Sequence, residues 1–295
     1  MAENMKAKLE KLLYVDDAYQ QASLFLSIIR EELEICDSFL RPQESKEFRQ
    51  YYHYLENTGG RHLSYWQNQY APKVQYLVGS SKPGSKVLDA GCGLGTEAIL
   101  SGILGAEVSG IDLSIERLTI ADKRAKFYQQ QLGRLLTVNF SAQSIFNVVD
   151  NFDVIWSQQS ISHIEPAAEF IGFCQQRLEQ GGKLIITDSN ALNPVVCLAA
   201  KREQRKRGGV YTTKVDPQTG KAVPYAQERL FSVRSIRKLI EIYDFHIEKL
   251  ITYGFSPYLP FSFRGKDVAY YTNWLDKVPV LKLLAAGYVV VATKI

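Results

Sequence analysis

The sequence predicts an α/β fold, in which a parallel sheet lies between two layers of helices. From Lys86 onward, short apolar runs typical of strands alternate with helical patterns, a spacing that indicates strand–helix–strand units with helices on both faces. Before Ser85, apolar residues recur every three or four positions and no strand pattern occurs. The segment 191–228 interrupts this alternation of strands and helices. We therefore divide the chain into a helical cap or lid (1–80) and a core (81–295) that carries a substrate-side insertion (191–228).

The composition excludes several classes of protein. The 295 residues are 46% hydrophobic and 22% charged, as in ordinary globular proteins. A net charge of +4 spread over 35 cations and 31 anions does not indicate nucleic-acid binding. The four cysteines are scattered without a CxxC pair, which argues against a disulfide framework or a zinc site and predicts a reducing, cytoplasmic location. The N-terminus lacks the pattern of a secretory signal, and no apolar run is long and uninterrupted enough to span a membrane.

The elements follow from the periodicity. A helical pattern runs from Lys6 to about Tyr54, and a further helix at 62–78 is expected to be interrupted near Pro72, because proline lacks the N–H donor. The core strands are expected at 86–91, 106–112, 135–140, 152–157 and 183–188. The helices between them are expected at 96–104, 114–133 and 166–182, the last ending in a glycine pair. After the insertion we expect a helix at 232–243 and strands at 246–255 and 287–294.

The turn after the first core strand, "VLDAGCGLGT", indicates a nucleotide site. Glycines let a ligand approach the backbone because no Cβ intrudes. Gly91, Gly93 and Gly95 have GxGxG spacing, and Thr96 stands where the dinucleotide fingerprint GxGxxG requires its third glycine. Asp89 would also repel a pyrophosphate. S-adenosylmethionine fits better, because it has no phosphates and its amino-acid end carries an ammonium and a sulfonium that a carboxylate favours, directly or through water.

An acid at the end of the second strand supports a nucleoside ligand. Asp112 follows Gly91 by 21 positions, and an acid at about that distance accepts the ribose hydroxyls. This position suits S-adenosylmethionine and NAD equally but disfavours NADP, whose 2′-phosphate it would repel. Alternatively, Asp112 caps the helix that begins at Ser114.

Four segments in order resemble one family. "VLDAGCGLG", "GIDLS", "FDVIWSQQSISHIEP" and "RLEQGGKLIITD" are similar to successive motifs of the class I, Rossmann-like S-adenosylmethionine-dependent methyltransferases, nearest to their small-molecule and quinone- or lipid-modifying branch. The resemblance covers residues 84–190, is weaker over 228–295, and includes no motif in 1–80 or 191–228. It implies a doubly wound sheet of seven strands, mostly parallel, whose last strand at 287–294 is antiparallel.

The resemblance also implies cofactor contacts. Gly91 and Gly93 would face the methionine end, Asp112 the ribose and Leu113 the adenine. The family usually has an acid after the third strand, which takes the adenine amino group, but this chain has Ser141 there. We expect backbone and amide groups of Ala142 and Gln143 to replace this acid. Ser157 and Gln158, at the end of the fourth strand, are expected to lie beside the reactive methyl.

On the acceptor side, His163 is the candidate general base, because it follows the fourth strand at the rim where the methyl would point; packing within its loop is the alternative. Side chains that could wall an acceptor pocket are Tyr65, Trp66, Tyr70, Asn190 and Tyr258, each of which could instead serve packing or a turn. The strand lacks the [DN]PP[YF] signature of amide- and adenine-methylating relatives, and no Asp, Glu and His cluster suggests a metal.

We interpret the chain as an enzyme that moves a methyl group from S-adenosylmethionine to an oxygen or nitrogen of a small, partly apolar acceptor by in-line displacement, with S-adenosylhomocysteine as product. One alternative is carbon methylation of a quinone or lipid at a membrane surface, which the apolar and basic segment 194–207 could contact. Another is a non-catalytic module that binds the cofactor and a partner. An NAD-dependent oxidoreductase is disfavoured by Asp89 and the GxGxG spacing.

Overall fold

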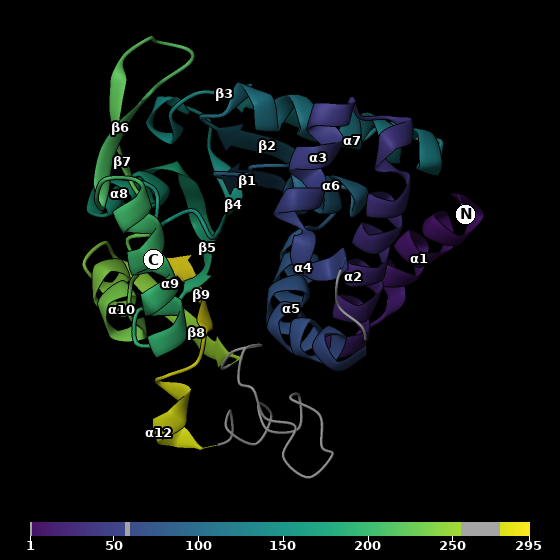
Figure 1. Ribbon diagram of the computed structural model, residues 1–295. Coiled ribbons are helices and arrows are strands. Elements are labelled where there is room, and N and C mark those ends of the chain that lie inside the picture. The colour runs from purple at the N-terminus through teal and green to yellow at the C-terminus, as the bar shows by residue number, and fades with distance from the viewer. Residues whose placement is uncertain (1, 57–59, 255–277) are drawn as a thin grey trace.

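The computed structural model describes residues 2–56, 60–254 and 278–295 (Figure 1). Its N-terminal part is helical, as the periodicity predicts. The elements are α1 (Ala2–Tyr14), α2 (Ala18–Ile35), the 3-10 turn η1 (Cys36–Ser38), α3 (Pro42–Tyr51), α4 (His53–Glu56) and α5 (Gly60–Ser80). The expected interruption at Pro72 is wrong, because α5 continues through it. Residues on both sides of the proline, among them Tyr70 and Val74, are buried in the main core, and this packing compensates for the lost hydrogen bond.

The core begins with the predicted alternation of strands and helices. It comprises β1 (Lys86–Ala90), α6 (Thr96–Ile103), β2 (Glu107–Asp112), α7 (Ile115–Leu132), β3 (Val138–Ala142), the 3-10 turn η2 (Ile145–Asn147), β4 (Phe152–Gln158), α8 (Ala167–Arg177) and β5 (Leu178–Ser189). The glycine pair does not end the helix as expected. The backbone is already extended at Leu178, which pairs with Phe152 of β4, and Gly181 and Gly182 lie within the strand.

The remainder of the chain adds an insertion and the far edge of the sheet. Its elements are α9 (Pro194–Lys206), β6 (Tyr211–Val215), β7 (Ala222–Ala226), α10 (Val233–Glu241), β8 (Phe245–Tyr253), α12 (Pro279–Lys282) and β9 (Gly287–Lys294). Strands β6 and β7 form a separate antiparallel hairpin around the turn "DPQTG". The hairpin projects from the body of the molecule on the side opposite α1 and α2 (Figure 1).

The sheet has seven strands in the order β3-β2-β1-β4-β5-β9-β8. The pairs from β3 to β5 are all parallel, whereas β9 runs antiparallel to both β5 and β8. The prediction of a doubly wound, mostly parallel sheet with an antiparallel last strand is confirmed. Strand order reverses between β1 and β4, and such a switch point is where open α/β sheets bind ligands, beyond the carboxyl ends of their strands.

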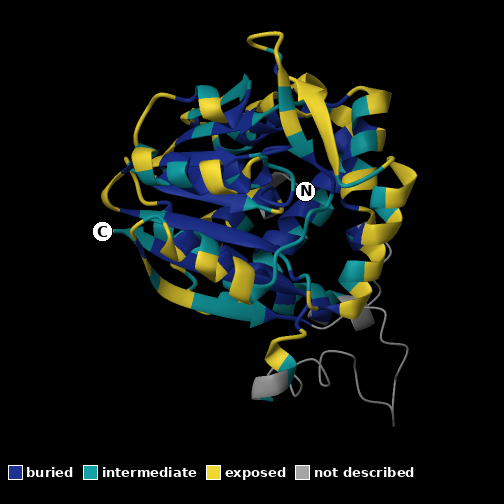
Figure 2. Cartoon of the chain, turned by 90° about the vertical axis from the view of Figure 1, so that its left-hand side faces the viewer, coloured by how far each residue is buried: buried dark blue, intermediate teal, exposed yellow. Residues whose placement is uncertain are grey.

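Alternate residues of the central strands enter two cores. Val87 of β1 and Trp156 of β4 pack against the N-terminal helices α2 and α5, whereas Leu88 and Ile155 pack against α8 and α10. The N-terminal helices therefore form part of one helical layer of the sheet. The strands are mostly buried, and exposed residues lie on the outer helices and the hairpin (Figure 2).

A buried ion pair joins this helical layer to the glycine turn. Arg124 of α7 binds both carboxylate oxygens of Glu32 of α2, at 2.5 and 2.8 Å, and both side chains are at most 1% exposed. Arg124 also donates to the Leu94 carbonyl and the Thr96 hydroxyl at the start of α6, and Tyr128 donates to Glu32. The N-terminal helices thus hold the turn in place through fully paired buried charges.

Candidate functional site

The glycine turn requires its glycines. Gly91, Gly93 and Gly95 all have positive φ, at 78°, 52° and 74°, a region that glycine occupies without steric cost. A Cβ on Gly91 would lie 2.6 Å from the Cβ of Ser160, in the loop after β4. The turn is held to β2 by bonds from the Gly91 and Cys92 N–H groups to the Ile111 carbonyl. The ends of β1, β2 and β4 therefore meet at this point.

Three carboxylates surround the turn. Asp89 is buried in β1, and its Oδ2 has no hydrogen-bond partner among the described residues. Glu97, in the first turn of α6, accepts a bond from the Gln158 amide at 2.5 Å. Burial raises the pKa of both Asp89 and Glu97, and the charge of Glu97 raises the pKa of Asp89 further. Together with Asp112, they make this end of the site unfavourable for a phosphate and favourable for a cation.

Asp112 lies at the centre of the site, at the end of β2. Its two carboxylate oxygens accept bonds from the Gly93 N–H at 3.0 Å and the Ser114 N–H at 2.8 Å. The N-cap of α7 is Ser114, whose hydroxyl accepts from Arg117, so Asp112 does not itself cap the helix. Each carboxylate oxygen has a second lone pair, which leaves Asp112 able to accept the two hydroxyls of a ribose.

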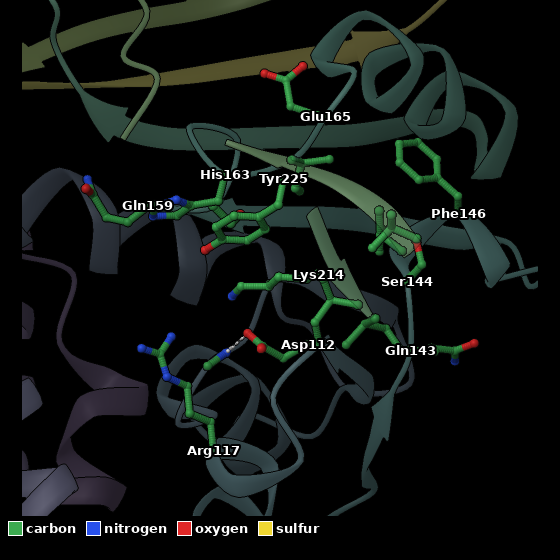
Figure 3. A pocket seen from close by; sticks show the side chains of 18 of the residues that line it. Asp112, Arg117, Gln143, Ser144, Phe146, Gln159, His163, Glu165, Lys214 and Tyr225 are labelled. Carbon is green, nitrogen blue, oxygen red and sulfur yellow. Dashed lines mark hydrogen bonds between the residues drawn. The ribbon is translucent and has the colours of Figure 1, made fainter. Parts of the chain in front are cut away.

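A cavity of about 310 Å³ opens beside Asp112. Six of the residues expected to contact the cofactor line it, namely Gly91, Gly93, Asp112, Leu113, Gln143 and Gln158. His163 lines the same cavity, as predicted from its place after β4. Lys214 of β6 and Tyr225 of β7 close it from the opposite side, with Lys214 lying between Asp112 and the Tyr225 ring (Figure 3). The hairpin therefore forms one wall of the site.

His163 is held by the hairpin. Its Nδ1 lies 3.0 Å from the Ala226 carbonyl oxygen, and its ring is stacked on that of Tyr225 with centroids 5.4 Å apart. Its Nε2 lies 3.6 Å from Oε1 of Glu228, which also lines the cavity. Because the carbonyl can only accept, Nδ1 carries the proton in the neutral ring and Nε2 has a free lone pair.

Several predicted site residues are not among those that line this cavity. Asp89 and Ser157 are buried, and Ala142 ends β3 next to the lining residue Gln143. Asn190 is fully buried, and its amide donates to the Leu283 and Ala285 carbonyls, which is a structural role.

The aromatic residues predicted to contact the acceptor lie in the N-terminal layer. Tyr65 and Tyr70 of α5 are buried, and the ring of Trp66 packs on that of Tyr54. The Tyr54 and Tyr70 hydroxyls are bonded to each other at 2.6 Å. The cavity described above does not include these side chains. Tyr258 lies outside the described residues.

Other lining residues were not predicted. They include Tyr51, Arg117, Ser144, Ile145, Phe146, Gln159, Lys214, Tyr225 and Glu228. Ser144, Ile145 and Phe146 directly follow Gln143, so their place after β3 could have identified them. The alternation around the "DPQTG" turn could have indicated a hairpin. Nothing in the sequence places Tyr51, at the end of α3, above the glycine turn.

The comparisons with known proteins agree with this geometry. Residues 60–250 match the family model described as a methyltransferase domain. The chain is 25% identical to a ubiquinone biosynthesis O-methyltransferase from Glaesserella parasuis over 191 residues, which cover 63% of this chain and 75% of the relative. It is 35% identical to phosphoethanolamine N-methyltransferase 3 from Arabidopsis thaliana over 111 residues, which cover 36% of this chain but only 21% of that protein.

A solved structure shares the fold. Magnesium protoporphyrin IX methyltransferase from Synechocystis, determined with bound S-adenosylhomocysteine, is similar over 90% of this chain and 100% of its own, with a TM-score of 0.52 and 17% identity. The family model covers more than half of this chain. The chain belongs to the methyltransferase domain family and is an S-adenosylmethionine-dependent methyltransferase.

Proposed function

We propose that the enzyme methylates a hydroxyl or amine of a small, partly apolar acceptor. The observation that carries the proposal is the arrangement of one cavity, which has Asp112 and the glycine turn on one side and the free Nε2 of His163 on the other. A base is required only when the acceptor loses a proton during transfer, as a phenol, an alcohol or an ammonium does. The O- and N-methylating relatives are consistent with such an acceptor.

The residues present fit S-adenosylmethionine. A Cβ at Gly91 would clash with Ser160, the buried Oδ2 of Asp89 has no partner among the described residues, and Asp112 keeps acceptor capacity beside the cavity. Leu113 and Ile145 supply an apolar surface for the adenine, and Gln143 supplies an amide in place of the acid that Ser141 replaces. When bound, the cofactor supplies a methyl group on a positively charged sulfur.

The remaining steps are performed by side chains of this chain. Asp112 would accept the ribose hydroxyls and the Gly91–Gly93 backbone would hold the amino-acid end. His163 would take the acceptor's proton at Nε2 while the acceptor oxygen or nitrogen forms its bond to the methyl carbon. The hairpin would exclude water from the reacting atoms, which also favours a fixed orientation of the acceptor.

Calorimetric titration tests the cofactor contacts. We expect S-adenosylhomocysteine to bind, and Asp112→Ala to weaken its binding by roughly 10- to 100-fold, because two charge-assisted hydrogen bonds are lost. Asp122→Ala, which removes an exposed carboxylate on α7, is the control and should bind normally. Unchanged binding by Asp112→Ala would refute the assignment of Asp112.

Transfer of a labelled methyl group to a panel of phenols, alcohols and amines tests the acceptor class. With the acceptor that the panel identifies, His163→Gln should lower kcat by about 10²- to 10⁴-fold and leave cofactor affinity unchanged. Full activity of this variant would refute the role of His163 as base, and the absence of transfer to any oxygen or nitrogen would favour the non-catalytic alternative or carbon methylation.

Carbon methylation of a quinone or lipid at a membrane surface is the second candidate, and α9 favours it. Val195 and Leu198 are 40% and 68% exposed on the helix, and exposed basic residues follow at its C-terminal end. Co-sedimentation with vesicles containing anionic lipid tests this; binding lost on Leu198→Ser would support it. Among the described residues, no helix is long and apolar enough to cross a membrane.

A cytoplasmic location and a small-molecule partner, rather than a nucleic acid, belong to the same proposal. They are supported by four cysteines that are all free thiols and by charges of both signs spread along the chain.

A further inference from the structure

We infer that Glu228 is a positioning residue for His163. Together with the β6–β7 hairpin, it orients the histidine ring so that Nε2 can accept a proton. This rests on the proposed function, in which His163 takes the acceptor's proton. Glu228 lies just after β7, in the insertion between β5 and α10, far in sequence from the loop that carries His163. The structure brings the two side chains together at the cavity wall.

The hairpin determines which ring nitrogen of His163 carries the proton. The Ala226 carbonyl accepts from Nδ1 at 3.0 Å, and the backbone bond from the Ala226 N–H to the His163 carbonyl, also 3.0 Å, fixes the two residues in register. Tyr225 covers one face of the ring at an interplanar angle of 9°. A hydrogen bond at one ring nitrogen sets the state of the other. Nε2 is therefore left as the proton acceptor only while the hairpin is in place.

Glu228 faces that free nitrogen. Among the described residues, it is the one acidic side chain with an oxygen within 4.0 Å of either ring nitrogen of His163. When an acceptor hydroxyl loses its proton, its oxygen would bond to the methyl carbon, the bond from that carbon to sulfur would break with its electron pair going to sulfur, and the proton would move to Nε2. The ring then becomes an imidazolium, and the Glu228 carboxylate lies where it stabilises this new positive charge.

The backbone of Glu228 indicates that its position is maintained for function. Its φ is +53°, a backbone conformation that is energetically costly for a residue with a Cβ. The conformation is held by the Gln204 amide, which donates to the Glu228 carbonyl at 2.8 Å, and by the Arg229 N–H, which donates to the Ser162 carbonyl at 3.0 Å. Glycine would adopt this backbone without strain, but it would not supply the carboxylate.

The other charged and titratable groups around His163 are engaged elsewhere. Asp188, at the end of β5, accepts bonds from the Ser162 and Ser189 N–H groups. Glu165 pairs with Arg229 at 2.8 Å. On the hairpin, Lys214 lies over the ring of Tyr225, 3.8 Å from its centroid. Asp188 also interacts electrostatically with His163, but Glu228 is the acid whose oxygen lies within ion-pair distance of a ring nitrogen.

Nitrogen-15 NMR of the four histidines tests the inference without an acceptor. His163→Gln identifies the His163 resonances. In the wild-type enzyme saturated with S-adenosylhomocysteine, we expect the neutral ring to carry its proton on Nδ1. We expect Glu228→Gln to keep this tautomer, because the tautomer depends on the Ala226 carbonyl.

A pair of glycine variants separates the positioning role from a structural one. Asp244 also has a positive φ, +54°, and is exposed between α10 and β8. Glu228→Gly and Asp244→Gly should both raise the denaturation midpoint or leave it unchanged, because both relieve backbone strain. With the acceptor identified by the panel, only Glu228→Gly and Glu228→Gln should lower kcat, by roughly 10- to 100-fold, with KM for S-adenosylmethionine little changed.

The outcomes distinguish this inference from the proposed function. A neutral His163 protonated on Nε2 would overturn the inference. So would unchanged kcat in both Glu228 variants alongside an inactive His163→Gln, which would leave the proposed function intact. If His163→Gln itself is fully active, the proposed base fails, and Glu228 with it.

Discussion

Two additions to the sheet cover the proposed cofactor site, and they are built in opposite ways. The N-terminal helices contribute Tyr51 to the cavity and share their core with the sheet, so that Leu26 and Ile29 pack in the same cluster as Val87 and Trp156. The β6–β7 hairpin contributes Lys214 and Tyr225, but all five residues of β6 are exposed. The helices form a fixed wall, whereas the hairpin is held by a few polar contacts.

The helices and the hairpin differ in the contacts that would break if each separated from the sheet. Separation of the helices would expose a large apolar area and break the buried Glu32–Arg124 pair. Separation of the hairpin would break mainly the contacts with His163 and those of Asp216 with the η2 region. Segments with few buried apolar contacts open at low free-energy cost. We therefore expect ligands to enter by movement of the hairpin, a motion that suits a lid.

The largest effect should follow from breaking the ion pair of the fixed wall. Glu32→Gln leaves the guanidinium of Arg124 buried without a counter-charge, and we expect it to lower the free energy of unfolding by about 3–5 kcal/mol. Urea denaturation measures this. The control is Lys126→Met, which removes an exposed ion pair with Asp122 on the same helix and should cost at most about 0.5 kcal/mol. Equal effects would mean that the helices are not held through this pair.

The sheet could be predicted because the sequence signals for its strands and helices are local. Apolar runs, turn residues and helical periodicity determine each strand and helix between 84 and 190, and the parallel order follows from their alternation. The prediction failed where tertiary packing overrides local preference. Pro72 should end a helix but lies within one that packs along the sheet, and the glycine pair at 181–182 lies in a strand because Leu178 already pairs with β4.

The site divides in the same way. That Gly91, Gly93 and Asp112 line one cavity was largely predictable, because they belong to segments joined by short connections. The acceptor side was not, since Tyr51 and Glu228 reach the cavity through long-range packing that leaves no periodic pattern. Asn190 illustrates the converse, as a polar residue after a strand that serves the buried carbonyls of 283 and 285.

Asp188, a buried carboxyl that accepts from the Ser162 N–H next to His163, can be tested by its pH dependence. Burial raises the pKa of Asp188 to about 6 from 3.8. A raised carboxyl pKa means that the folded state binds this proton more tightly, so the contribution to stability is complete below about pH 4 and is lost as the pH rises through 6. Relative to Asp188→Asn, the wild type should therefore gain roughly 3 kcal/mol as the pH falls from 7 to 4. Chemical denaturation across this range measures the difference, and a constant difference would contradict it.

A matched pair of glycines tests the rigidity of the turn itself. Gly91 and Gly84 have nearly the same φ, 78° and 77°, but a Cβ at Gly84 meets nothing within 4 Å whereas one at Gly91 meets Ser160. Gly84→Ala should cost about 1–2 kcal/mol from backbone strain alone. Gly91→Ala should cost a further 1–3 kcal/mol from overpacking and should weaken S-adenosylhomocysteine binding, which Gly84→Ala should not. An equal loss of unfolding free energy in the two variants would mean that the loop after β4 moves to accommodate the Cβ at no cost.

The smallest effect on global stability should come from releasing the hairpin. Asp216 at its turn is buried and accepts from the Asn147 amide at 2.6 Å, as well as from Gln218 and Thr219 within the turn. Asp216→Ala should change the free energy of global unfolding by less than about 1 kcal/mol, because the hairpin can open locally. It should nevertheless speed hydrogen exchange in β6 and β7 and accelerate dissociation of S-adenosylhomocysteine. Thr212→Ala, on the exposed face of β6, serves as the control. Because His163 takes its tautomer from Ala226 on the same hairpin, release should also allow a proton to move to Nε2. If instead Asp216→Ala destabilises the enzyme as much as Glu32→Gln does, the hairpin belongs to the fixed wall and the contrast between the two covers is wrong.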